Sequence, residues 1–243
     1  MSTVLILGAR SDMARAFAHR FALSGHDLIL AARRSDDLHD AVNDLKIRYA
    51  VEVHAVEFDA LDYASHPAFV DGLSGRPDIT ICVFGYLGDP ETARHDFAEA
   101  ERIVATNYTG AVSVLNIIAD AYETAKQGVI IGISSVAGDR GRQSNYLYGS
   151  AKAGFSTYLA GLRNRLAPVG VHVMTVKPGF VATRMTEGMD LPAALTASPE
   201  RVANDVYRAF DRRRNVVYTM WVWRYIMLII RSIPEFLFKK LSM

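Results

Sequence analysis

A tyrosine and a lysine stand four positions apart in the sequence, at Tyr148 and Lys152. Residues with this spacing share one face of a helix, so the lysine ammonium is expected beside the tyrosine phenol. A phenol has an ordinary pKa of about 10, and an adjacent positive charge favours its ionised form. Tyr148 is therefore predicted to exchange a proton with a bound substrate near neutral pH. Tyr146 has Ser150 at the same offset and lacks this partner.

A serine pair follows the apolar run Gly128 to Ile133, and its second member, Ser135, could donate a hydrogen bond to a substrate carbonyl. The spacing of Tyr148 and Lys152 alone also fits an aromatic helix face with a solvated lysine, because chance supplies it often. The chemical interpretation is favoured because Ser135 and a glycine turn at Gly8 would both lie at the carboxyl edge of one sheet.

These side chains need a scaffold, and the sequence alternates short apolar runs with longer segments of helical pattern. The strand-like runs are Thr3 to Leu7, Asp27 to Ala31, Val51 to Phe58, Ile79 to Phe84, Gly128 to Ile133, Val171 to Val176 and Val216 to Tyr218. The helix-length segments are Ser11 to Leu23, Ser35 to Arg48, Asp62 to Leu73, Glu91 to Thr124, Asn145 to Leu166 and Ser198 to Phe210. Strands separated by crossover helices pair in parallel, and near-continuous Val, Ile and Leu content indicates that both faces are covered. The predicted fold is a single α/β domain, a Rossmann-like doubly wound parallel sheet of seven strands with helices on both faces.

The first predicted strand ends in a glycine turn, Gly8-Ala9-Arg10-Ser11-Asp12-Met13, that leads into a helix. The backbone N–H groups at the start of that helix would point outward, which favours binding of a phosphate group. Gly8 permits the turn, and Ala14 is small enough for close packing of helix and strand. Asp12 would place a carboxylate near an anionic ligand, and it could instead cap the helix.

The second predicted strand ends in Ala31-Ala32-Arg33-Arg34, where an enzyme selective for NAD usually carries an acid that binds the ribose hydroxyls. Since that acid is missing, Arg33 and Arg10 could converge on a 2′-phosphate, whose oxygens match the guanidinium fork. The sequence therefore predicts NADP(H) as the preferred cofactor, with NAD(H) as the second choice. The alternative interpretation is that the two arginines lie at the surface and bind no cofactor. An oxidised nicotinamide ring would add to the positive charge that favours ionised Tyr148.

Composition excludes several other functions for this chain of 243 residues, which has 27 Lys and Arg against 26 Asp and Glu. The net charge of +1 does not indicate a protein held on nucleic acid by a global field. One cysteine, Cys82, can form neither an internal disulfide framework nor a thiolate-rich zinc site, and no metal site is expected. Cys82 lies in an apolar run and is expected in the core. The amino end lacks a basic leader, so a reducing, cytoplasmic location is expected.

No linker, repeat or low-complexity tract divides the chain. One domain is therefore expected, with residues 1–220 as its dinucleotide-binding catalytic part and residues 221–243 as its amphipathic tail. The stretch Thr183 to Ala197 has no clear period and is predicted to form a mobile apolar flap. The run Asp211 to Arg214 is expected to be a solvated helix end, with contact to a membrane or a phosphate as the alternative.

The tail predicts a helix from Trp221 to Lys240 that breaks near Pro234. Its apolar run Tyr225 to Ile230 has six residues, far fewer than the ~18 that a bilayer span requires. Bulky apolar groups mixed with basic residues are typical of an interfacial segment, which could present the active site to a membrane. Packing against the domain or against a second subunit is the other interpretation, and both stay open.

The chain resembles the short-chain dehydrogenase/reductase family along nearly its whole length. Gly8 and its turn match the family's TGxxxGxG element, although Leu7, Asp12 and Ala14 replace its threonine and its last two glycines. Ser135 precedes Tyr148 by 13 positions, the family's usual interval. Asp59 falls at the adenine-binding position, and Val83-Phe84-Gly85 falls on the Asn-Ala-Gly tripeptide, of which it keeps only the glycine. Further matches are Asn107 at the helix asparagine, and Pro178, Gly179, Val181 and Thr183 in the PGxxxT segment.

The resemblance implies an oxidoreductase that reduces a ketone to a secondary alcohol with a nicotinamide cofactor. The catalytic tetrad that it implies is Asn107, Ser135, Tyr148 and Lys152. The cofactor contacts expected from the resemblance and from the two strand ends are Gly8, Arg10, Ser11, Asp12, Met13, Arg33, Asp59, Ala60, Phe84, Gly85, Tyr148, Lys152, Pro178, Gly179, Val181 and Thr183. Dimers or tetramers are usual in the family, so a homodimer or homotetramer is expected.

Some segments outside the general family motifs are similar to a subgroup that reduces a 2-keto pentofuranose carried on a polyprenyl (decaprenyl) phosphate. They include Phe58 to Asp62, Phe84 to Asp89 and Trp223 to Pro234. A small-molecule or lipid-linked sugar substrate is therefore expected, the latter with the protein at the inner face of the membrane. The alternatives are another carbonyl, such as an acyl thioester or a free sugar, and a non-catalytic NADP(H)-sensing protein. The complete tetrad argues against the sensor, which would need only the cofactor half.

Overall fold

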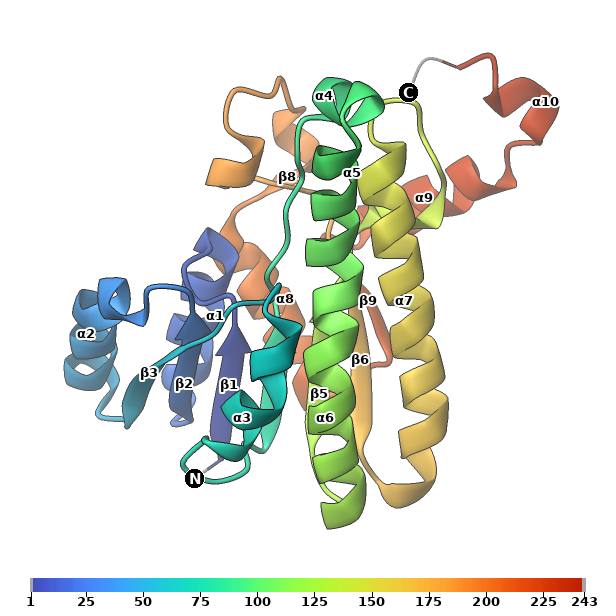
Figure 1. Ribbon diagram of the computed structural model, residues 1–243. Coiled ribbons are helices and arrows are strands. Elements are labelled where there is room, and N and C mark those ends of the chain that lie inside the picture. Colours follow the sequence, from blue (N-terminus) through green and yellow to red (C-terminus); the bar gives the residue numbers. More distant parts are fainter. Residues whose placement is uncertain (1, 242–243) are drawn as a thin grey trace.

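The structure, a computed structural model, describes residues 2–241 as a central sheet with helices on both sides (Figure 1). Its strands are β1 Thr3–Leu7, β2 Asp27–Ala32, β3 Val53–Glu57, β4 Ile79–Cys82, β5 Val129–Ile133, β6 His172–Lys177, β7 Phe180–Val181, β8 Thr196–Ala197 and β9 Val216–Tyr218. Its α-helices are α1 Asp12–Ala22, α2 His39–Tyr49, α3 His66–Asp71, α4 Pro90–His95, α5 Phe97–Val104, α6 Gly110–Ala125, α7 Tyr146–Leu166, α8 Pro199–Asp211, α9 Val222–Ser232 and α10 Glu235–Phe238.

The central sheet within residues 2–241 has seven strands, all parallel, in the order β3-β2-β1-β4-β5-β6-β9. The strand order reverses between β1 and β4, because the chain builds the sheet outward in one direction from β1 and in the other from β4. In doubly wound sheets, ligands bind in the crevice that such a reversal opens at the carboxyl ends of the strands. The predicted seven-stranded, doubly wound parallel sheet is confirmed.

Apolar side chains of each strand alternate between the two faces of the sheet and meet a different helix layer on each. Val4 and Ile6 share a core with residues of α1, α2 and α8, whereas Leu5 and Leu7 share one with residues of α6 and α7. All four side chains are fully buried, as expected of a parallel strand covered on both faces. Cys82 lies in the second core, as predicted, and burial raises the pKa of its thiol to about 12.

One long predicted helix, Glu91 to Thr124, is instead divided into α4, α5, a π-helical turn at Ala105–Thr109, and α6. Asp96 causes the first break, because its backbone is extended and its side chain accepts a hydrogen bond from Ala98 N (2.9 Å). A residue in this conformation ends one helix and caps the next. The prediction of one continuous helix there is wrong.

The stretch Thr183 to Ala197 contains more regular structure than predicted. Its last two residues form β8, which pairs in parallel with β7. Two short 3₁₀ turns, Arg184–Thr186 and Ala193–Leu195, precede that strand. A strand of two residues carries no periodic signal, so the sequence pattern could not reveal it.

The tail forms the two helices that the sequence predicted, α9 and α10, and the break falls at Ile233 and Pro234. One face of α9 buries Trp223 and Met227 in the same core as α1 and α8. Gly179 permits this contact, because a Cβ atom there would lie 1.9 Å from Trp223 Cε2. Among residues 2–241, no helix is both long and apolar enough to cross a membrane.

Candidate active site

The glycine turn after β1 lies where the strand order reverses. Gly8 adopts a φ of +95°, and a Cβ atom there would lie 2.7 Å from Phe84 Cβ on the segment after β4. Glycine alone satisfies both this backbone conformation and this close approach. Ser11 caps α1 by accepting a hydrogen bond from Ala14 N (3.1 Å). The suggestion that Asp12 caps this helix is therefore wrong.

Asp12 is paired with a residue of the flap. Its carboxylate accepts hydrogen bonds from the backbone N–H of Arg184 (2.8 Å) and from its guanidinium Nε (3.2 Å). The same guanidinium donates to Arg10 O (2.5 Å). The arginine offsets the carboxylate charge that would otherwise repel a phosphate at the glycine turn. Sequence reasoning missed Arg184, because it lies 172 positions from Asp12 and no local pattern links the two.

A pocket of about 360 Å³ lies beside the glycine turn and the segment after β4. One acid, Asp59, stands against five arginines in its wall. These are Arg10, Arg33, Arg34, Arg102 and Arg184. Arg10 and Arg34 each contact Asp37 (3.0 Å and 3.5 Å), whereas the exposed Arg33 has no ion pair within residues 2–241. A concave site with this excess of guanidinium groups fits a ligand that carries phosphate.

Half of the predicted cofactor contacts line this pocket. These are Gly8, Arg10, Ser11, Arg33, Asp59, Ala60, Phe84 and Gly85. The residues that do not line it are Asp12, Met13, Tyr148, Lys152, Pro178, Gly179, Val181 and Thr183. Sequence reasoning missed Arg34, Arg102 and Arg184 in the wall. The structure therefore places the glycine turn and the ends of β2, β3 and β4 around one hollow, with the remaining residues outside it.

The predicted residues outside the pocket form its surroundings. Met13, behind the turn, packs against the core of α1. Pro178 O accepts a hydrogen bond from Val136 N (3.0 Å), which ties the PGxxxT segment to the turn after Ser135. Val181 is buried in β7, and Thr183 directly precedes the 3₁₀ turn that carries Arg184.

Helix α7 carries Tyr148 and Lys152 on consecutive turns beside the end of β5. The Nζ of Lys152 lies 5.7 Å from the centre of the Tyr148 ring and donates a hydrogen bond to Ile133 O (3.1 Å). Ser135, two residues beyond Ile133, lies near Tyr148, and its side chain lowers the pKa of the Tyr148 hydroxyl. The structure thus brings the serine hydroxyl, the phenol and the amine together at the carboxyl edge of the sheet.

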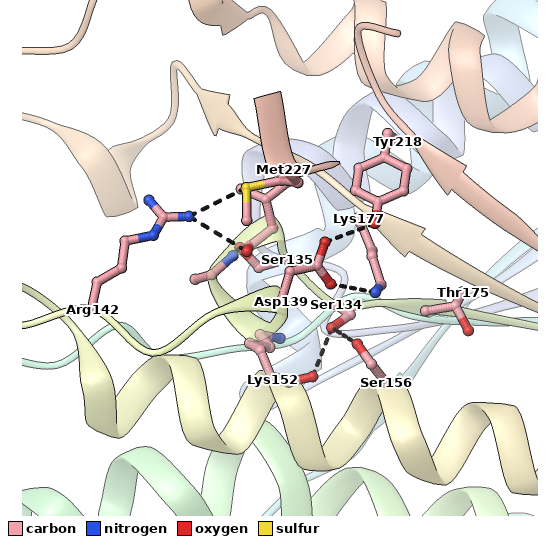
Figure 2. Close-up of polar contacts among 12 residues, drawn as sticks. Ser134, Ser135, Asp139, Arg142, Lys152, Ser156, Thr175, Lys177, Tyr218 and Met227 are labelled. Atoms are coloured by element: carbon pink, nitrogen blue, oxygen red, sulfur yellow. Dashed lines mark hydrogen bonds and ion pairs between the residues drawn. The ribbon is translucent and has the colours of Figure 1, made fainter. Parts of the chain in front are cut away.

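The first serine of the pair holds α7 in this position. Ser134 Oγ donates a hydrogen bond to Lys152 O (2.9 Å) and shares another with Ser156 Oγ (2.7 Å), as Figure 2 shows. The bond to Lys152 O is buried and the bond to Ser156 is partly buried, and a buried hydrogen bond also prevents the cost of an unpaired polar group. Ser134 therefore fixes the helix, and Ser135 lies on the side of Tyr148.

Burial sets the pKa of both the phenol and the amine. It raises the pKa of Tyr148 to about 12, although the hydrogen bond from Ser135 lowers it, and it lowers the pKa of Lys152 to about 8. The prediction that the lysine lowers the tyrosine pKa is not met by the protein groups alone, because loss of hydration on burial has the largest effect on this pKa and raises it. Tyr148 keeps its proton at neutral pH, while Lys152 changes charge close to neutral pH.

Asn107 lies in the π-helical turn and is 1% exposed. Its Oδ1 accepts a hydrogen bond from Tyr86 N (3.2 Å), and its Nδ2 donates to Tyr86 O (2.5 Å) and Ile103 O (2.8 Å). A Cβ atom on Gly85 would lie 2.9 Å from Asn107 Oδ1 and 3.5 Å from Lys152 Nζ. Since Gly85 lines the arginine pocket, Asn107 and Lys152 both lie directly behind that part of its wall.

A second polar cluster braces the turn that follows Ser135 (Figure 2). The Asp139 carboxylate, 3% exposed, accepts hydrogen bonds from Lys177 Nζ (2.5 Å) and from the Tyr218 hydroxyl (2.7 Å). Burial and the adjacent carboxylate raise the pKa of Tyr218 to about 12. These bonds join the turn after Ser135 to Lys177, which directly precedes Pro178, and to Tyr218 in β9. Sequence reasoning missed this cluster, because its members come from three separate segments.

Comparison with known proteins identifies relatives over nearly the whole chain. The family model for short-chain dehydrogenases matches residues 2–192. An uncharacterized oxidoreductase of Mycobacterium tuberculosis is 41% identical over 241 residues, which cover 98% of this chain and 96% of the relative. Another from Streptomyces coelicolor is 36% identical over 242 residues, 98% of this chain and 95% of the relative. A solved short-chain dehydrogenase from Sphingobium yanoikuyae, in complex with NADPH, has a TM-score of 0.83 at 25% identity and covers 97% of each chain.

Fold, site and relatives together define an NAD(P)-dependent oxidoreductase with a Rossmann-like sheet. The chain belongs to the short-chain dehydrogenase family, as the sequence resemblance indicated.

Proposed function

We propose that the chain is an NADP(H)-preferring reductase that converts a ketone into a secondary alcohol, with Tyr148 as the proton donor. Residues 1–220 would form the catalytic part and residues 221–243 its tail. The observation that carries this proposal is the position of Lys152 Nζ, which lies 5.7 Å from the Tyr148 ring, is bonded to Ile133 O at the end of β5 two residues before Ser135, and is close to Gly85 in the pocket wall.

The arginine pocket supports a dinucleotide with a 2′-phosphate. Arg33 and Arg34 follow β2, whose end lies beside the adenosine ribose in Rossmann-like sheets. Arg33 has no ion-pair partner in residues 2–241, so a ligand phosphate would not have to displace a carboxylate from it. The solved relative from Sphingobium yanoikuyae binds NADPH, which agrees with this preference. NAD(H) remains the second choice, because Asp59 and Ala60, at the position expected to bind the adenine that both cofactors share, also line the pocket.

Each residue of the tetrad has a distinct task in this proposal. The bound nicotinamide cofactor supplies a hydride to the carbonyl carbon. Tyr148 donates its proton to the carbonyl oxygen, and Ser135 holds that oxygen by a hydrogen bond. Lys152 stabilises the resulting phenolate and binds the nicotinamide ribose, while Asn107 positions a water that connects Lys152 to solvent. Pro178, Gly179, Val181 and Thr183 would contact the nicotinamide end.

The substrate that we propose is a 2-keto pentose on a polyprenyl phosphate, reduced at the cytoplasmic face of the membrane. The resemblance of Phe58 to Asp62 and of Trp223 to Pro234 to the subgroup described above supports this choice. Other carbonyl substrates, such as acyl thioesters and free sugars, are the alternatives. The protein would act as a homodimer or homotetramer, and its tail would contact either a membrane or another subunit.

The test is turnover. NADPH oxidation is followed with a polyprenyl-phosphoryl 2-keto pentose, with acyl thioesters and with small soluble ketones. We expect oxidation with at least one ketone, and the highest kcat/KM for the lipid-linked sugar. Higher efficiency with an acyl thioester would exclude the sugar substrate. Binding of NADPH without turnover across the whole panel would exclude the reductase.

A further inference from the structure

The tail exposes an unusual amount of apolar surface. Sixteen large apolar side chains are exposed among residues 2–241, and seven of them lie in the short segment 221–241. The seven are Trp221, Tyr225, Leu228, Ile229, Phe236, Leu237 and Leu241. Large apolar side chains that gather on the exposed side of one segment of a folded chain mark a contact with a partner or a membrane.

This surface is held in place by the fold. The opposite face of α9 buries Trp223 and Met227, and Trp223 Nε1 donates a hydrogen bond to Leu195 O (3.2 Å). The second tail helix is tied by Arg140, which pairs with Glu235 (2.6 Å) and lies 4.2 Å above the Phe238 ring. The exposed side chains therefore belong to helices docked on the domain, and they face outward because their inward positions are already filled.

A basic groove adjoins this apolar surface. It has a volume of about 1010 Å³, lies between α8, β9 and the start of α9, and is lined by five arginines and one acid, Asp205. The arginines are Arg201, Arg208, Arg212, Arg214 and Arg224. Arg208 pairs with Asp205 (2.5 Å), whereas the other four have no ion pair within the part of the chain that the structure describes. Trp221 and Tyr225 belong to both the groove and the apolar surface.

The combination of the two features decides which partner fits. A second copy that met this face about a two-fold axis would bring one set of arginines close to the other, which costs free energy. A nucleic acid would neutralise the arginines but would leave Leu228, Ile229 and Leu237 without an apolar partner. A bilayer with anionic lipids satisfies both, because phosphates lie at its surface and hydrocarbon lies just below.

We propose that α9, α10 and the basic groove together form a docking surface for a membrane that contains anionic lipids. The aromatic and aliphatic side chains enter the boundary between headgroups and acyl chains, and the groove arginines bind lipid phosphates. Membrane docking itself does not depend on the proposed function. Only the further idea that the substrate is held in the same membrane rests on it.

The surface is also connected to the catalytic turn. Arg142, in the loop after the Ser135 turn, directs its guanidinium Nη2 to Val136 O (3.5 Å) and to the sulfur of Met227 on α9 (3.6 Å), as Figure 2 shows. A helix seated on the membrane would thus hold the turn that carries Ser135 a short distance from the lipid. A substrate on a polyprenyl anchor could then be reduced without leaving the bilayer.

The test is co-sedimentation of the full chain with vesicles of phosphatidylcholine alone and with vesicles that also contain phosphatidylglycerol. We expect binding to the anionic vesicles that decreases with added salt. Arg224→Glu should weaken this binding about tenfold, because each basic residue near an anionic surface contributes favourably and here one is reversed. Ile229→Ser should weaken it as well.

Two matched controls separate a specific surface from a general effect. Arg76→Glu makes the same change of net charge on an exposed loop before β4, and Ile47→Ser removes a comparable exposed side chain from α2. Both should bind vesicles as the unmodified chain does. Equal losses in Arg224→Glu and Arg76→Glu, or no binding to anionic vesicles, would overturn the proposal.

The remaining outcomes are also decisive. If Ile229→Ser converts an oligomer to a monomer in size-exclusion chromatography with light scattering, the face is a subunit contact and the proposal is wrong. Turnover of a soluble ketone, measured without vesicles, separates the two claims. Retained turnover without vesicle binding removes the docking surface alone, whereas vesicle binding without turnover of any ketone leaves docking intact and removes the proposed function.

Discussion

The two ends of the candidate site are built in opposite ways. The arginine pocket is open, and Arg33 and Arg34 at the end of β2 are exposed. At the other end, Asn107 and Lys152 are almost fully buried and bonded to backbone carbonyls. Guanidinium groups stay charged in water and can bind a phosphate from mobile side chains, whereas proton transfer needs fixed distances. In the proposed function, the exposed arginines would bind the cofactor phosphate and the buried side chains would transfer the proton.

The largest expected effect is at the buried end. Tyr148→Phe should lower turnover about 10²- to 10⁴-fold, because it removes the proton donor, while the affinity for NADPH stays unchanged. Steady-state kinetics and a fluorescence titration of the cofactor measure the two quantities. Tyr146→Phe, on the same helix, is the control and should retain full activity. Normal turnover of the Tyr148 variant would show that the buried end carries no chemistry.

The buried brace gives the next largest effect, on stability. Lys177→Met leaves the Asp139 carboxylate buried without its cation, and this should cost about 3–5 kcal/mol of unfolding free energy. Arg48→Met breaks an exposed pair with Asp44, which water and salt screen, and should leave the unfolding free energy almost unchanged. Denaturant unfolding compares them. Equal losses would mean that burial makes no difference between these two pairs.

At the open end, cofactor choice should change without a loss of chemistry. Arg33→Asp should weaken NADPH binding roughly 10- to 100-fold relative to NADH, because it removes a charge-assisted bond to the 2′-phosphate. The kcat with saturating NADH should stay the same. Dissociation constants for both cofactors check this, and an unchanged ratio would show that Arg33 does not bind the 2′-phosphate.

The smallest effect is a pH dependence that belongs to the buried end. Lys152, with a pKa of about 8, is an ammonium below that pH and an amine above it. The proposed reduction needs the ammonium, so kcat/KM should be about tenfold lower at pH 9 than at neutral pH. The Tyr148 pKa of about 12 lies too high to contribute. A profile that stays flat to pH 10 would contradict this assignment to Lys152.

Sequence predicted the fold well because parallel strands covered on both faces have a strong local signature. Thr3 to Leu7 and Val216 to Tyr218 match β1 and β9 at both ends. One error lies between α4 and α5, where Asp96 interrupts a segment whose apolar spacing predicts a continuous helix. The other lies at β8, which is too short to show any hydrophobic periodicity. Extended backbone at a single residue leaves the surrounding apolar spacing intact, so periodicity does not detect it.

For the site, the sequence predicted the relation between residues that are close together in the chain. It did not predict which residues from distant parts of the chain form hydrogen bonds with each other. The spacing of Tyr148 and Lys152 sets their common helix face, since helical geometry depends only on sequence separation. The pairing of Asp12 with Arg184 depends on where the flap folds, and so does the contact of Asp139 with Lys177. The direction in which the Tyr148 pKa shifts depends on burial, and burial is known only from the whole packed structure.

The single thiol offers a practical consequence. Cys82 is 1% exposed, and its raised pKa leaves almost no thiolate to react. The native chain should therefore remain unmodified by maleimide reagents while it is folded. A cysteine introduced at an exposed position of α9 would then be the one site that takes a fluorophore, so its emission could follow the helix without any background from the rest of the protein.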